Sequence, residues 1–188
     1  MSLRLAAMLA VLLPLATTPA VAQKLSSPLS FTVFAGASIP IGDSSDGLNT
    51  GYTIGAAADL RAPATPLGGR LEGSYSNWGA KGLAGSGLSA DASEFGANLN
   101  LVLWFPMTAP TSISPYVTAG PSFSRFKGTV SSGGASFSQT ENHWGFNAGG
   151  GVDIAIGELA VRVDARYKRI SGDNGNFQSI PVTFGVRF

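Results

Sequence analysis

The feature that most constrains this chain is a two-residue alternation of apolar and polar side chains that recurs along most of its length. In residues 159–168, for example, Leu159, Val161 and Val163 alternate with Arg162 and Asp164. Because successive side chains of a β-strand point to opposite faces, each such segment predicts a strand with one apolar and one polar face. Six segments show the pattern clearly and two, 69–78 and 115–127, show it more weakly. The expected strands are residues 30–41, 52–61, 69–78, 94–103, 115–127, 144–154, 159–168 and 180–188.

Strand length and the connections between strands favour a membrane barrel. The clear segments run for about 9 to 12 residues, whereas a strand of a soluble protein averages ~5–6 and a tilted strand that crosses a bilayer needs ~9–11. Connections rich in Gly, Ser, Asn and Asp (42–50, 79–90, 128–142 and 171–177) alternate with the connections 62–68, 106–114 and 157–158. An even number of strands with long loops at one end is typical of outer-membrane barrels. We therefore predict an all-β fold, an eight-stranded antiparallel up-and-down transmembrane β-barrel, in which segments 79–90 and 128–142 are the external loops expected to contact neighbours.

The first 22 residues predict export from the cytoplasm. Arg4 precedes an apolar run over residues 5–15, and Ala20-Val21-Ala22 has the small-x-small pattern of a signal-peptide cleavage site. The apolar run is too short to span ~30 Å of hydrocarbon at ~1.5 Å per residue. We expect cleavage after Ala22, so that residues 1–22 are a signal peptide and residues 23–188 form the barrel of the cell outer membrane.

A soluble secreted β-sandwich is the main alternative fold, since its strands also alternate but turn their apolar faces inward. Charged residues make up only 12% of the chain and glycines number 25. The apolar faces hold much alanine and glycine, with aromatic rings near their ends, which suits contact with lipid better than a sandwich core. Hydrocarbon offers no hydrogen-bond partners, so a sheet in the membrane must close on itself.

The polar faces predict the contents of the barrel. An eight-stranded barrel is only wide enough for its own side chains, and buried charges are stable when they are paired and hydrogen-bonded. We expect a plugged lumen with a connected polar network, and a small channel with a narrow lumen is the alternative. The predicted network is Asp59, Arg61, Arg70, Glu72, Glu94, Asp153, Arg162, Asp164, Arg166, Lys168 and Arg187.

Aromatic residues gather toward the two ends of the expected strands, as the interfacial girdles of membrane barrels do. The outer girdle is predicted to contain Tyr52, Tyr75, Trp78, Phe95, Phe123, Trp144 and Tyr167, and the periplasmic girdle Phe31, Trp104, Phe105 and Tyr116. Trp104 and Tyr116 nevertheless fall in the polar phase of their strands. Pro121 and Pro181 lie inside expected strands, where each removes a hydrogen-bond donor, and Pro121 is expected to mark a bulge.

The end of the chain carries a family resemblance. Residues 182–188 alternate apolar side chains and finish on an aromatic residue, so that they resemble the C-terminal strand signal of outer-membrane barrels, here Phe184, Val186 and Phe188. Segments 144–153 and 161–167 look like the late hairpin of small OmpA/OmpX-type barrel domains, and 115–120 is similar to their fifth strand. The resemblance implies outer-membrane lipid and the barrel-assembly machinery as partners, in a member without the peptidoglycan-binding domain.

The sequence contains few residues of the types that bind metals or act in catalysis. It has one histidine, no cysteine and a net charge of +1 without a basic stripe, so we expect no cofactor, no metal site and no nucleic-acid partner. Asp43, Asp46 and Asp173 are solvated turn residues or at most weak calcium ligands. We expect no enzyme but a structural and surface-interaction protein. The enzymatic alternative is a lipid-modifying hydrolase of the outer membrane, with His143 as base, Glu141 orienting it and Ser138 or Ser122 as nucleophile.

Overall fold

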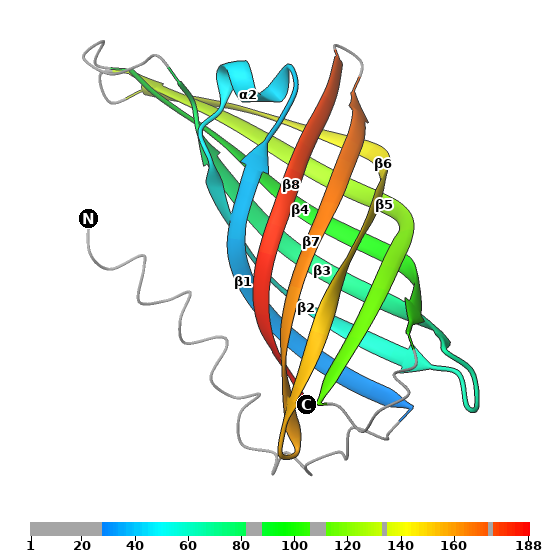
Figure 1. Ribbon diagram of the computed structural model, residues 1–188. Helices are drawn as coiled ribbons and strands as arrows, with labels where there is room; N and C mark the ends of the chain where they lie inside the picture. Colours follow the sequence, from blue (N-terminus) through cyan, green and yellow to red (C-terminus); the bar gives the residue numbers. More distant parts are fainter. Residues whose placement is uncertain (1–27, 82–87, 106–111, 133–134, 173–174) are drawn as a thin grey trace.

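The chain forms a closed barrel of eight antiparallel strands in sequence order (Figure 1). A computed structural model describes residues 28–81, 88–105, 112–132, 135–172 and 175–188; the expected signal peptide, residues 1–22, lies outside them. Within these ranges no helix is long and apolar enough to span a membrane. The elements are β1 (Leu29–Pro40), α2 (Ser44–Gly47), β2 (Gly51–Arg61), β3 (Leu67–Gly79), β4 (Leu88–Trp104), β5 (Ile113–Ser132), β6 (Ala135–Ile156), β7 (Leu159–Gly172) and β8 (Gly175–Arg187).

The barrel closes by pairing its first strand with its last. Thr32 lies opposite Arg187 in the β1–β8 register. Beyond that pair the backbone N–H of Phe31 donates to the carbonyl of Phe188 at 2.8 Å, and the N–H of Phe188 donates back at 2.9 Å. Closure leaves no sheet edge to be solvated, as hydrocarbon requires. The observed fold is thus the predicted barrel and not the β-sandwich.

Pro121 lies within β5 without producing the expected bulge. Pairing of β5 with β4 is present at Asn98↔Ser122 and again at Leu101↔Ala119. Each strand advances by three residues between these pairs, so no residue is inserted. The bulge prediction was wrong because the ladder tolerates a short lapse in pairing where proline has no N–H.

Pro181 has the same effect on β8. The strand pairs with β7 at Ala165↔Val182 and again at Lys168↔Ser179, with an unchanged register. On its other side Pro181 stays opposite Ser38 of β1. Both prolines are therefore accommodated by an interruption toward one neighbouring strand only.

The predicted external loop 128–142 is largely a β-ribbon. Strands β5 and β6 remain paired through Lys127↔Thr140 and Thr129↔Ser138 as far as Ser132↔Ala135, and β4 likewise begins at Leu88, inside the predicted loop 79–90. We call the end with the predicted external loops the outer end, and the opposite end, where the C terminus lies, the periplasmic end. The yellow-green ribbon of β5 and β6 leans away from the outer end of the barrel (Figure 1). The hydroxyl-rich composition of this ribbon resembles that of a loop. A strand surrounded by water needs no apolar outer face, so the alternation that predicts the membrane strands is missing here.

The outward-facing side chains change character at one level around much of the barrel. Below this level they are aromatic or aliphatic, and two residues further out on the same strand they are polar or charged. We call this level the outer boundary. It runs between Tyr75 and Asn77 on β3, Phe95 and Ser93 on β4, Phe123 and Arg125 on β5, Trp144 and Asn142 on β6, and Tyr167 and Arg169 on β7.

Candidate functional site: the lumen and its outer vestibule

Ten of the eleven charged residues predicted for the lumen are buried inside the barrel, each at most 6% exposed. They comprise five carboxylates and five cationic groups, so the buried charge is balanced. The carboxylates are Asp59, Glu72, Glu94, Asp153 and Asp164, and the cations are Arg70, Arg162, Arg166, Lys168 and Arg187. All lie in the polar phase of their strands, which faces away from lipid.

The periplasmic half of the network is centred on Arg162 of β7. Its guanidinium donates to Asp153 of β6 at 2.7 Å and, across the lumen, to Asp59 of β2 at 2.7 Å. Arg70 donates to the other oxygen of Asp59 at 2.6 Å, and Arg187 donates to Asp153 at 2.8 Å. Each carboxylate here has two cationic partners, which is the paired and hydrogen-bonded state that makes burial of charge tolerable.

Tyr116 joins this network, contrary to its predicted place in the periplasmic girdle. Its side chain is 2% exposed, and its hydroxyl donates to Asp164. The guanidinium carbons of Arg70 and Arg162 lie 4.7 Å and 5.1 Å from the centre of its ring, within the range of cation–π contact. Arg166 donates to the other oxygen of Asp164 at 2.5 Å. The position of Tyr116 in the polar phase of β5 correctly indicated the lumen, whereas its aromatic side chain had led to the girdle prediction.

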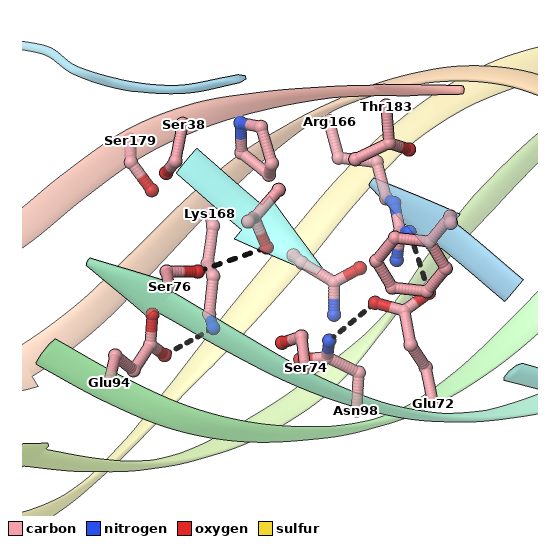
Figure 2. A pocket seen from close by; sticks show the side chains of 14 residues that line it. Ser38, Glu72, Ser74, Ser76, Glu94, Asn98, Arg166, Lys168, Ser179 and Thr183 are labelled. Carbon is pink, nitrogen blue, oxygen red and sulfur yellow. Dashed lines mark hydrogen bonds and ion pairs between the residues drawn. The ribbon is translucent and has the colours of Figure 1, made fainter. Parts of the chain in front are cut away.

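The outer half of the network also depends on β7 (Figure 2). Arg166 donates to Glu72 of β3 at 2.6 Å, and the same carboxylate accepts from the amide of Asn98 at 2.9 Å. Lys168 forms an ion pair with Glu94, which also accepts from the Ser124 hydroxyl. The free space between these side chains is about 20 Å³, about the room that one water requires. Charged and polar groups thus fill this level of the lumen.

Arg61 lies in the inward phase of β2, as predicted for the network, but it is only half-buried. Its guanidinium carbon lies 4.2 Å from the centre of the Trp104 ring, and none of the ion pairs found in the described part of the chain includes it. Trp104 is 4% exposed, so its predicted place in the lipid-facing girdle was wrong. Both residues lie at strand ends on the periplasmic side, where a half-buried guanidinium stacks on a ring.

Trp78 also faces the lumen and not, as predicted, the lipid. It is 0% exposed, and its indole N–H donates to the carbonyl of Ser38 at 3.1 Å. Its ring centroid lies 4.9 Å from that of Phe177 and 6.4 Å from that of Phe126, and the two phenylalanine rings meet at 5.0 Å. With Ile170, which is 1% exposed, these rings form what we call the outer lid. Trp78 shares the even-numbered phase of Arg70 and Glu72, a signal that would have placed it inside.

The other predicted girdle aromatics lie in the apolar, outward phase of their strands or at a strand end. They are Phe31, Tyr52, Tyr75, Phe95, Phe105, Phe123, Trp144 and Tyr167. Neighbouring strands bring some of the rings together: Tyr75 and Phe95 lie 4.9 Å apart, and Phe123 and Trp144 lie 5.1 Å apart. These two pairs sit immediately below the outer boundary.

Above the outer lid lies a hollow of about 450 Å³, which we call the outer vestibule. Its walls come from α2 and the segments beside it, and from the outer ends of β5, β6, β7 and β8. The α2 segment is fixed to β8 because the Ile41 N–H donates to the Gln178 carbonyl at 3.0 Å, and the Gln178 N–H donates to the Ser44 hydroxyl at 2.9 Å. Figure 1 shows α2 above the end of the barrel opposite the C terminus.

The residues suggested for a hydrolase do not assemble. The His143 ring lies 3.1 Å from Glu141, but Ser122 is fully buried and accepts from Asn147 at 3.0 Å. Ser138 lies opposite Thr129 in the projecting ribbon, five residues along the strand from His143. In the described ranges no group of three or more His, Cys, Asp or Glu residues is placed to hold a metal ion; Asp173 lies outside those ranges.

Comparison with known proteins agrees with this architecture. The family model for the outer membrane protein beta-barrel domain matches residues 8–188. The chain belongs to this family. It is accordingly an integral protein of the outer membrane. The outer boundary, where the outward-facing side chains change from apolar to polar, marks the level at which its strands leave the lipid.

Solved structures of small barrels share the fold at low identity. Neisserial surface protein A matches with a TM-score of 0.59 and 20% identity, covering 86% of this chain and 96% of that one. Ail, the attachment invasion locus protein of Yersinia pestis, in complex with the heparin analogue sucrose octasulfate, gives 0.51 and 15%, with 85% and 97% covered. The outer membrane enzyme PagL gives 0.54 and 20%, with 83% and 97% covered. A search of curated protein sequences found no match.

Proposed function

We propose that this protein is a structural anchor that presents a contact surface outside the cell. The barrel holds the chain in outer-membrane lipid, and the ribbon formed by the outer parts of β5 and β6 makes contacts with macromolecules in the surroundings. The observation that carries the proposal is the continued pairing of these strands beyond the outer boundary, from Arg125↔Asn142 to Ser132↔Ala135.

The composition of the ribbon supports a role in contact. Its outward face carries Arg125, Lys127 and Thr129 on β5, and Ser138 and Thr140 on β6. A hydrogen-bonded ribbon loses less conformational entropy on binding than a loose loop of the same length does. The two cationic side chains favour an anionic partner, and sulfated glycans are the class that we infer.

The filled lumen supports anchoring over conduction. Five cationic and five anionic groups occupy the interior and are joined by ion pairs across it, for example Asp59–Arg162 and Glu72–Arg166. We expect the purified protein to leave planar bilayers electrically silent. Steady single-channel conductance that changes on substitution of Arg166 would favour the small channel instead.

A shortened ribbon tests the contact role. Residues 129–138 are replaced by an Asn-Gly turn, which suits a two-residue hairpin, while the barrel is left intact. We expect the variant to keep the gel-mobility shift between boiled and unboiled samples that marks a folded barrel. Cells that display it should bind immobilised heparin more weakly than cells displaying the intact chain, because Arg125 and Lys127 remain while the paired surface beyond them is removed.

An Arg125→Gln/Lys127→Gln variant with a full-length ribbon is the matched control for charge. It should lose most heparin binding if the cations make the contact. Equal binding by all three proteins, or no binding by the intact chain, contradicts the proposed sulfated-glycan contact. If the intact protein turned over lipid and the His143→Ala variant did not, the hydrolase would be favoured instead.

The C-terminal segment supports a second partner, the barrel-assembly machinery. Phe184 and Val186 face outward and are 61% and 42% exposed, and Phe188 closes the barrel through its backbone bonds to Phe31. We expect Phe188→Ala to lower the amount of folded protein in the outer membrane several-fold. Refolding of the purified variant into detergent should be affected much less, which separates recognition during assembly from stability.

A further inference from the structure

We propose that the outer vestibule is a binding site for small organic cations that carry an apolar body. The ammonium group would lie beside Asp43 and Glu141, and the apolar body would lie on Phe126 and Phe177. The site lies on the inner side of the strands, separate from the outward face of the ribbon that we assign to contacts, so the two roles stand or fall independently.

The floor of the vestibule is apolar although it lies at the water-exposed end of the barrel. Phe126 and Phe177 meet edge to face with their centroids 5.0 Å apart, and Ile170 beside them is 1% exposed. Trp78 closes the space beneath these rings. These side chains face away from lipid, so lipid contact does not explain them. A concave apolar surface of about 450 Å³ with a few polar groups at its edge has the size and character of a small-molecule site.

The charge around the vestibule is negative. Asp43 and Glu141 line it, and no lysine or arginine is among its lining residues in the described ranges. The partners of the Glu141 carboxylate are the amide of Gln139 at 2.8 Å and the His143 ring at 3.1 Å, so it retains capacity for a cation. Asp43 precedes α2 without capping it through its side chain. Two carboxylates at the edge of an apolar hollow attract and hold a positive ligand.

Aromatic faces add selectivity for a cation over a neutral molecule. The rings of Phe126, Phe177 and His143 stand around one hollow, with the Phe126–His143 centroids 6.2 Å apart. An ammonium within ~6 Å of a ring centroid is attracted by the electrons of the ring face. Nearby cationic side chains are not among the lining residues: the Lys81 ammonium is engaged by the Ser45 carbonyl of α2 at 2.5 Å, and Arg125 and Lys127 lie in the outward phase of β5.

Titration of folded protein in nonionic octyl glucoside micelles tests the site. The probes are benzyltrimethylammonium, its neutral isostere neopentylbenzene, and the anion benzenesulfonate. We expect saturable one-to-one binding of the cation by calorimetry, with roughly 10-fold or greater weakening for the neutral isostere and none measurable for the anion. Equal affinity for the neutral isostere, or no saturable binding of the cation, overturns the proposal.

Substitutions then locate the bound cation. Glu141→Gln and Asp43→Asn should each weaken binding by roughly 3- to 30-fold, and so should Phe126→Ala. Glu158→Gln, in the turn at the periplasmic end, removes a carboxylate far from the vestibule and should leave affinity unchanged. The gel-mobility shift verifies folding, and the two carboxylate variants keep the test valid if Phe126→Ala does not fold. Unchanged affinity in both carboxylate variants also overturns the proposal, since it indicates partition of the probe into the micelle.

Discussion

The same strands are built in opposite ways on the two sides of the outer boundary. Within the membrane, β5 turns Val117 and Phe123 outward and Ser122 and Ser124 inward. Beyond the boundary it turns Arg125 outward and Phe126 inward, although the alternation of faces continues without a break. The difference teaches that the strand period determines which residues share a face, and that the surrounding solvent determines which face is apolar.

The two parts of the barrel consequently have different interiors. In the membrane part the apolar side chains face the surrounding lipid. The polar side chains that alternate with them therefore face the lumen, where they form ion pairs. The outer part is surrounded by water, and its interior is the apolar outer lid, as in a soluble protein. The cost of a substitution should therefore depend both on the face that it occupies and on its side of the outer boundary.

The largest effect is expected from breaking the buried network. Arg162→Met leaves Asp59 and Asp153 each short of a cationic partner inside the membrane part. We expect it to lower the free energy of unfolding by about 3–5 kcal/mol, as measured by urea unfolding in phospholipid vesicles. Lys127→Met, on the outward face beyond the boundary, should change it by less than about 0.5 kcal/mol. A loss below about 1 kcal/mol in Arg162→Met would falsify the view that the network is tightly coupled.

A charge placed on the outer face should discriminate lipid from water. Leu71 is 61% exposed and faces outward near the middle of β3. We expect Leu71→Arg to destabilise the barrel by about 2–4 kcal/mol, as lipid-facing arginine does in membrane barrels. Thr129→Arg, on the outward face of the ribbon, should be close to neutral in the same unfolding assay. Similar costs at both positions would mean that the boundary is misplaced.

A smaller effect is expected from removing one methyl group from the outer lid. Ile170 is 1% exposed, so Ile170→Val opens a small cavity and should cost about 0.5–1.5 kcal/mol. Ile54 is 48% exposed on the outward face of β2, where lipid fills the space that Ile54→Val leaves. The second variant should be indistinguishable from the parent protein. Equal losses would show that the lid is not packed as a core.

The smallest effect is expected for the pair of Glu141 and His143. The Glu141 side chain is 46% exposed, and ion pairs of such exposure contribute about 0.2–1 kcal/mol. Glu141→Gln should therefore change the free energy of unfolding by less than about 1 kcal/mol, although we expect it to weaken binding of benzyltrimethylammonium. A large loss of stability would indicate a structural role for this carboxylate.

Periodicity alone predicted the membrane part well. The phase of Asp59, Arg70 and Arg162 placed them on the polar faces, and closure of eight strands then left the lumen as their location. Amino-acid type was the weaker signal. Trp78, Trp104 and Tyr116 were predicted to face lipid because they are aromatic, while their phase indicated the interior.

The outer part could not be predicted from the same rules. The ribbon over residues 128–142 has the Gly, Ser and Thr content of a loop, and its strand character comes from pairing of β5 with β6, which composition does not report. The outer vestibule required tertiary information as well. Glu141 and His143 are near each other in sequence, but Asp43 and Phe177 reach the same hollow only through closure of β1 onto β8.

The distribution of lumen charge along the chain has a consequence for how the ring is completed. Strands β2 to β4 supply Asp59, Glu72 and Glu94 with only Arg70, a net charge of −2, whereas β6 to β8 supply four cations and two carboxylates, a net charge of +2. The carboxylates of β2 to β4 therefore gain their partners Arg162, Arg166 and Lys168 of β7 only when the two halves come together. Opposite charge draws the two halves together, and the gain in free energy arrives when the last strands dock. We therefore expect the completed ring to unfold as a single cooperative unit, since its two halves are electrostatically complementary.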